Sequence, residues 1–201
     1  MSTATDPAHL SPEGLDLLFR HARTYHAWKP EPVPDSTLRE IYDLFKFGPT
    51  SFNTCPARIV FLRTEEAKAR LLPALMPMNV EKSRTAPVVA IVAYDTEFYE
   101  KLAKLAPHAD GRSFFVGNAA LIQETAFRNG SLQGAYFILA ARATGLDCGP
   151  MSGFDPGKVN AEFFPDGKWK ANFICNLGHG DASKQHPRAP RLDFEEACIL
   201  L

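Results

Sequence analysis

The sequence predicts one domain that combines helices with a β-sheet, and three segments carry this prediction. Residues 87–94 (PVVAIVAY) are apolar on both faces, which is typical of a strand at the centre of a sheet. Residues 170–177 are predicted to form a second strand with alternating apolar side chains. Residues 118–144 instead place apolar side chains at helical spacing. We therefore expect a sheet with residues 87–94 at its centre and helices packed around it.

The remaining elements are predicted in the same way, from apolar spacing and from capping residues. A short buried strand is expected at residues 58–63 (RIVFLR). Helices are expected at residues 11–23, 35–47, 64–72, 96–105 and 155–164. In the second of these, Leu38, Ile41, Tyr42 and Phe45 are predicted to point inward. Residues 77–82 are expected to be irregular.

The long helical segment 118–144 has two notable features. Asn129-Gly130-Ser131 is a candidate break, with Ser131 as a new cap, and one face carries Leu132, Tyr136 and Leu139 among other apolar residues. Gly145 provides the left-handed residue that ends such a helix. Residues 145–155 then form a Gly/Pro-rich connection almost without bulky side chains, and Asp155 is expected to cap the next helix. This connection would let a flat ligand approach the backbone, although local composition alone favours an ordinary loop.

Length, composition and charge limit the functional classes. With 201 residues, the chain fits a flexible tail (residues 1–10) and one domain (residues 11–201). The net charge of −1 gives no basic excess for nucleic acid, and no apolar run approaches the ~20 residues of a membrane span. The four cysteines are widely spaced and no signal-peptide core is present, so reduced thiols in the cytoplasm are expected.

Several common catalytic signatures are missing from the sequence. Gly178-His179-Gly180 follows a strand but lacks the third glycine of a dinucleotide fingerprint. The histidines show no metal-binding spacing, and no Gly-x-Ser-x-Gly elbow occurs. Cys55 beside Pro56 is interpreted as structural rather than nucleophilic. Side-chain chemistry of these kinds is therefore not predicted.

Five groups of polar or loop residues remain, and their order along the chain is informative. The group nearest the N-terminus contains an arginine, with its fork of donors, and a threonine, with a short hydroxyl donor. This combination suits a phosphate, although a solvated helix end would show the same residues. The groups are Arg23, Thr24 and His26; Thr50, Ser51 and Asn53; Asn79 and Lys82; Pro150, Met151, Ser152 and Gly153; and Arg188 and Arg191.

This order resembles the nitroreductase family of FMN-dependent NAD(P)H oxidoreductases, from about Leu15 to the end of the chain. Phe127-Arg128-Asn129, the segment 149–155 and the segment 190–198 look like its RutE-type malonic semialdehyde reductase branch. The resemblance implies an α+β three-layer sandwich, with a central, mainly antiparallel sheet flanked by helices. It also implies a homodimer whose C-terminal segment extends onto the partner subunit, with FMN at the interface.

The resemblance further implies a role for each group of residues. Arg23, Thr24, His26 and the C-terminal arginines would bind the FMN phosphate, and residues 150–153 would support the flavin ring. Asn79 and Lys82 would face the pyrimidine edge of the ring, and Thr50, Ser51 and Asn53 would come from the partner. The family often has arginines where this chain has Ala22 and His26, and glutamine where it has Cys55.

The expected reaction is the transfer of a hydride from NAD(P)H through the flavin to a small acceptor. Malonic semialdehyde, reduced to 3-hydroxypropionate in pyrimidine degradation, is the acceptor that the branch implies. A broad nitroaromatic or quinone reductase is a second possibility in the same class. A flavin-binding protein without turnover is a third, from another class.

Overall fold

The computed structural model describes residues 9–201, so most of the predicted tail, residues 1–8, lies outside the described part. The sheet has four strands, β1 (Ala57–Leu62), β2 (Val88–Asp95), β3 (Asp147–Met151) and β4 (Trp169–Gly178). They lie in the order β1-β2-β4-β3, and each neighbouring pair is antiparallel. All of β2 is buried, which confirms the central strand predicted at residues 87–94.

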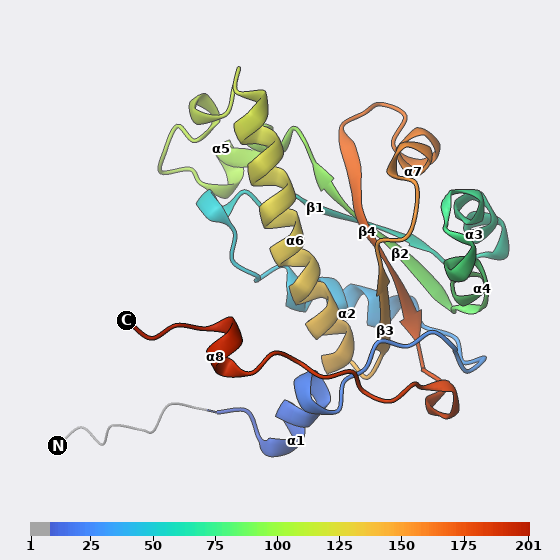
Figure 1. The fold of residues 1–201 in the computed structure, drawn as a ribbon. Helices are drawn as coiled ribbons and strands as arrows, with labels where there is room; N and C mark the ends of the chain where they lie inside the picture. Colours follow the sequence, from blue (N-terminus) through green and yellow to red (C-terminus); the bar gives the residue numbers. More distant parts are fainter. Residues whose placement is uncertain (1–8) are drawn as a thin grey trace.

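Helices of very different length surround the sheet (Figure 1). The α-helices are α1 (Pro12–Leu15), α2 (Asp35–Phe45), α3 (Glu65–Leu71), α4 (Pro77–Thr85), α5 (Leu102–Leu105), α6 (Ala119–Ala143), α7 (Pro156–Phe163) and α8 (Phe194–Ala197). A π-helical turn, Asp16–Arg20, continues α1. Short 3₁₀ turns lie at Ser51–Asn53, Leu72–Ala74, Phe98–Lys101, Arg112–Phe114 and Ala182–Lys184. Within residues 9–201, no helix is both long and apolar enough to cross a membrane.

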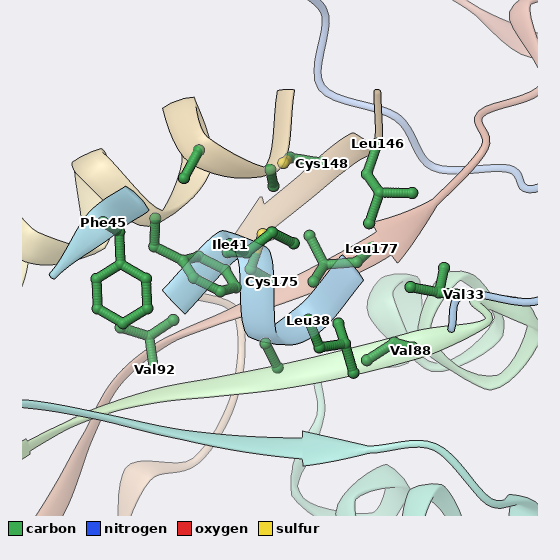
Figure 2. Close-up of a cluster of buried hydrophobic side chains, with 14 residues drawn as sticks. Val33, Leu38, Ile41, Phe45, Val88, Val92, Leu146, Cys148, Cys175 and Leu177 are labelled. Atoms are coloured by element: carbon green, nitrogen blue, oxygen red, sulfur yellow. The ribbon is translucent and has the colours of Figure 1, made fainter. Parts of the chain in front are cut away.

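The helices form one layer on each face of the sheet. Helices α2 and α6 cover one face, where Ile41 and Phe137 pack on Val92 in the cluster shown in part in Figure 2. Helices α3 and α7 cover the other, where Leu71 and Val159 pack on the opposite side chains of β2. The predicted α+β three-layer sandwich is therefore confirmed.

Helix α6 is continuous, so the predicted break at residues 129–131 is wrong. The Ser131 hydroxyl donates to the Phe127 carbonyl within the helix and caps nothing. The buried face is built largely of small and polar residues. At Gly134 an added Cβ would lie 2.5 Å from the Phe173 ring, so this helix needs glycine there to approach β4. Leu132 and Tyr136, on the apolar face noted in the sequence, remain 46% and 41% exposed.

Three further sequence predictions are corrected. Residues 77–82 belong to α4, which starts with proline as its first residue, a position that suits the fixed φ of Pro77. Residues 147–151 are not a loop but the edge strand β3. Tyr42 is 54% exposed because it lies beside, not on, the buried stripe of α2. The cap predicted at Asp155 is confirmed, and Thr64 and Asn118 cap their helices in the same way.

Candidate functional site

The predicted ring-binding segment lies at the end of β3. Gly145 ends α6 with φ of +83°, as predicted, and the chain then pairs with β4 from Asp147 to Met151. Ser152 and Gly153 follow, with Ser152 exposed. A hollow of about 370 Å³ lies between this segment and α6. Its lining comprises Ser131, Ala135, Ile138, Pro150, Met151, Ser152 and Phe173.

Asn79 and Lys82 lie against the same segment, although they are distant in sequence. Asn79 is 4% exposed and donates from Nδ2 to the Gly153 carbonyl at 2.9 Å. The Lys82 ammonium donates to Asn79 Oδ1 at 3.1 Å. Both residues are on α4, whose helical spacing places positions three apart on one side. The amide and the ammonium are thus held next to residues 150–153.

Trp28 is a further candidate site residue, which the sequence alone did not indicate. Its indole N–H donates to the Lys82 carbonyl at 3.0 Å and so connects residues 23–28 to the last turns of α4. In the sequence, Trp28 is followed by Pro30, Pro32 and Pro34, which by themselves indicate only an extended segment. A tryptophan between polar site candidates was the available signal, because a buried indole normally finds an acceptor.

The basic group near the N-terminus is held by β3 and by the C-terminal segment. Thr24 forms a parallel bridge with Cys148, and the Tyr25 N–H donates to the Cys148 carbonyl at 2.9 Å. Arg23 donates to the His186 carbonyl at 2.5 Å, and the imidazoles of His26 and His186 stack at 5.0 Å. Residues 23–26 and 186 therefore lie together beside the start of β3.

The two C-terminal arginines differ in their contacts. Arg188 donates to the carbonyls of Arg20 and Ala22, both at 2.8 Å, and so lies beside the basic group. Within the described part of the chain, Arg191 donates only to the carbonyls of its neighbours Ala189 and Pro190.

The charge of this region is positive and largely uncompensated. Among the described residues, Arg23, Arg188 and Arg191 form no ion pair with a carboxylate. Burial and the nearby Asp147 carboxylate raise the pKa of the Tyr25 hydroxyl, so this side chain adds no negative charge at neutral pH. Guanidinium groups without acidic partners are the donors that bind phosphate. The donor set at this end of β3 therefore fits a phosphate group.

The Thr50 group lies elsewhere, in a segment that we call the 50–56 loop. Its backbone contacts Asn129 of α6, whereas the hollow is lined by Ser131 and Ala135 of the same helix. At about 100° per residue, Asn129 and Ser131 point to nearly opposite sides of α6. Figure 1 shows the segment around residue 52 and β3 on different sides of this helix. Within one chain, Thr50, Ser51 and Asn53 are thus apart from residues 150–153.

The 50–56 loop has an unusual backbone. Phe52, Asn53 and Cys55 have φ of 56°, 51° and 41°, in the left-handed region that side chains other than glycine rarely adopt. Asn53 donates from Nδ2 to the Leu105 carbonyl at 2.7 Å. Cys55 donates from Sγ to Asn53 Oδ1 at 3.2 Å and is therefore part of the loop's internal packing.

Apart from the Thr50 group and Arg191, the predicted residues gather along β3. Arg23, Thr24 and His26 lie at its start, and Asn79 and Lys82 lie beyond its end, at Gly153. No group of three or more residues suited to a metal ion occurs among residues 9–201. The arrangement offers an anion site, an edge of amide and ammonium donors, and between them the edge strand β3, which ends next to the exposed Ser152. It can bind an elongated ligand that is flat at one end and anionic at the other.

Comparison with known proteins identifies close relatives. The model described as "Nitroreductase family" matches residues 20–179. A proposed NADH dehydrogenase/NAD(P)H nitroreductase of Ralstonia nicotianae is 58% identical over 192 residues, which cover 96% of this chain and 98% of that protein. A protein of the same name from Rhodopseudomonas palustris is 58% identical over 200 residues, covering 100% of this chain and 99% of that protein.

Solved structures share the fold at low identity. A proposed nitroreductase of Bacillus subtilis has a TM-score of 0.83 at 23% identity and covers 92% of this chain and 97% of its own. A proposed nitroreductase from Exiguobacterium sibiricum, solved in complex with FMN, has a TM-score of 0.83 at 16% identity. The match covers 96% of this chain and 99% of that one. At such identities these likenesses establish the fold alone.

Proposed function

The chain belongs to the nitroreductase family, and from this premise we propose that it is an FMN-dependent oxidoreductase that passes a hydride from NAD(P)H to a small acceptor. The names of relatives at 58% identity support the nicotinamide donor and the reductase class. The FMN complex of the Exiguobacterium neighbour supports the flavin. The observation that carries the proposal is the Lys82–Asn79–Gly153 hydrogen-bonded chain, which places an ammonium beside the backbone that follows β3.

Each part of the proposed site has a task that its chemistry allows. FMN would supply the hydride chemistry, which no side chain here provides. Arg23, Thr24, His26, Arg188 and Arg191 would bind the phosphate through charge-assisted hydrogen bonds. The segment Pro150, Met151, Ser152 and Gly153 would support the ring, with the Ser152 N–H directed to flavin N5. Asn79 and Lys82 would bind the N1–C2=O edge, where the ammonium opposes negative charge on the reduced ring.

We further propose that the protein is a homodimer with FMN at the interface, completed by Thr50, Ser51 and Asn53 of the partner. Separation of these residues from Gly153 by α6 supports this arrangement. Exposed apolar side chains support it as well, since large exposed patches mark interaction sites. They include Leu132 and Tyr136 on α6 and Leu192, Phe194, Ile199, Leu200 and Leu201 in the C-terminal segment.

A mixed dimer tests whether the site is shared. One variant carries Lys82→Met with Arg23→Ala, and the other carries Asn53→Ala with Ser51→Ala. If each site combines Arg23 and Lys82 of one chain with Ser51 and Asn53 of the other, all four substitutions fall on one site of the mixed dimer. The other site then has only wild-type residues. Half of the FMN sites should then recover activity. Absence of recovery would show that both groups act within one chain.

For the acceptor we propose malonic semialdehyde, reduced to 3-hydroxypropionate in cytoplasmic pyrimidine degradation. The sequence resemblance of Phe127-Arg128-Asn129 and residues 190–198 to that branch supports this substrate. The alternative is a broad nitroaromatic or quinone reductase, which the nitroreductase names of the relatives favour. Both reactions use the same reduced flavin, so the acceptor step distinguishes them.

Stopped-flow reoxidation decides between the acceptors. The FMN-loaded protein is reduced under argon and mixed with malonic semialdehyde, a nitrofuran or a quinone. The proposal predicts that malonic semialdehyde reoxidises the flavin fastest at equal concentration. Faster reoxidation by the nitrofuran or quinone would establish the broad reductase instead. No reduction by either NADH or NADPH would indicate a flavin-binding protein without turnover.

A further inference from the structure

Two buried amide side chains of α6 hold the ends of the 50–56 loop. Asn129 and Gln133 are 2% and 3% exposed and lie one helical turn apart. Asn129 Oδ1 accepts a hydrogen bond from the Ser51 N–H at 2.7 Å. Gln133 Oε1 accepts one from the Ala57 N–H at 2.9 Å, where β1 begins. The two amides thus bind backbone groups on either side of the strained residues.

The loop depends on such external contacts for its shape. Phe52, Asn53 and Cys55 have left-handed φ values, and residues of this kind persist only where the surroundings enforce them. Asn129 is itself oriented, because its Nδ2 donates to the Thr125 carbonyl at 2.8 Å within α6. The acceptor oxygen is therefore fixed toward Ser51. A leucine at either amide position would fill a similar volume but leave a backbone N–H unpaired.

We propose that Asn129 and Gln133 are positioning residues, which hold the 50–56 loop in the shape in which Thr50, Ser51 and Asn53 reach the flavin of the partner subunit. This inference rests on the proposed function, which assigns the loop to the flavin. Helix α6 then serves two sites, since its other side lines the hollow at residues 150–152 of its own chain. The rigid helix would fix the loop relative to the helix surface that faces the partner.

The thiol of Cys55 provides a direct probe of the loop. It is half-buried, whereas Cys148 and Cys175 are fully buried and Cys198 is exposed. In a Cys198→Ser background, the rate at which the FMN-loaded protein reacts with a chromogenic disulfide reagent therefore reports on Cys55. The dissociation constant for FMN, measured by fluorescence, reports on the flavin site.

Variants of both amides are compared with a conservative variant and a matched control. Asn129→Leu and Gln133→Leu remove the acceptors. Gln133→Glu retains the acceptor oxygen, and Thr125→Val changes a buried side chain one turn before Asn129 without touching the loop. The two leucine variants should raise the Cys55 labelling rate and the FMN dissociation constant by about tenfold each, the factor expected for one lost buried hydrogen bond. Gln133→Glu and Thr125→Val should change both quantities much less.

Two results would overturn the inference. Unchanged labelling in both leucine variants would show that the amides do not hold the loop. Faster labelling with an unchanged FMN dissociation constant would show that the shape of the loop does not matter to the flavin. Either result leaves the proposed function intact if the parent protein binds FMN and is reduced by NAD(P)H. A parent protein that binds no FMN would refute the proposed function itself.

Discussion

Replacement of Lys82 by methionine should lower the reduction potential of bound FMN. The variant keeps an unbranched side chain of similar length and removes only the positive charge. The Lys82 ammonium is oriented by Asn79, which in turn is bound to the Gly153 carbonyl, so its position relative to the ring segment is well defined. A charge at the N1–C2=O edge favours the reduced form, which carries negative charge, over the neutral oxidised form. Loss of that charge therefore changes the redox equilibrium as well as the affinity.

The size of the shift follows from the strength of a charged hydrogen bond. Such a bond contributes about 1.5–3 kcal/mol. For a two-electron couple, about 1.4 kcal/mol corresponds to 30 mV, so the midpoint potential should fall by roughly 30–65 mV. The backbone of Lys82 should not move, because its carbonyl remains the acceptor of the Trp28 indole at 3.0 Å. The shift can therefore be attributed to the charge.

The assay is a dye-linked titration with xanthine and xanthine oxidase at saturating FMN. Lys158→Met is the matched control, since Lys158 is an exposed lysine on α7, outside the predicted site. The control should keep the wild-type potential. Equal potentials for wild type and Lys82→Met would place this ammonium away from the ring and refute the reasoning.

Three further predictions concern the phosphate, the core and pH. Arg23→Ala should weaken FMN binding by roughly tenfold or more while leaving riboflavin binding unchanged; equal losses for both flavins would make Arg23 structural. Asp95→Ala should lower the free energy of unfolding by about 3 kcal/mol, because the partly buried Arg58 guanidinium, 2.6 Å from Asp95 in the native protein, loses its carboxylate partner. Urea denaturation measures this change, and a loss below 1 kcal/mol would contradict the prediction. The Cys148 thiol and burial raise the pKa of Cys175 well above its ordinary value of 9.0. In the unfolded chain this thiol ionises at a lower pH than in the folded protein. Its contribution to the free energy of unfolding is therefore fully present below about pH 9 and is lost as the pH rises above it. Cys175→Ala should flatten this alkaline decline in denaturation curves, and parallel curves would refute the assignment.

Elements with local signals were predictable from the sequence. The strand β2 is a run of apolar residues, and any sheet that contains it must bury it on both faces. Thr64, Asn118 and Asp155 cap helices through their own side chains, which bond to N–H groups three residues on. These features depend on neighbouring residues alone, so the sequence is sufficient to identify them.

Elements whose buried surface is polar or small were not predictable in the same way. The buried residues of α4 are Asn79 and Ser83, so no apolar stripe marks it as a helix. The buried face of α6 includes Asn129, Gln133 and Gly134, which is why more exposed apolar residues such as Leu132 and Tyr136 were the more visible signal.

The candidate site shows the same division. The family resemblance indicated which residues to expect at the site, but the positions of these residues relative to one another depend on tertiary contacts. Trp28 was missed because its partner, the Lys82 carbonyl, is distant in sequence. The edge strand β3 contains Gly149 and Pro150, which disfavour a strand, and it forms through pairing with β4.

Anaerobic reduction of the purified, FMN-loaded protein tests the central claim most directly. The protein is made yellow with FMN, freed of excess flavin and titrated under argon with NADH or NADPH. A flavin oxidoreductase of this family should lose its yellow colour with one equivalent of nicotinamide per bound flavin, and should regain it when an acceptor is added. A protein that binds no FMN, or that stays yellow with both nicotinamides, would contradict the proposed function.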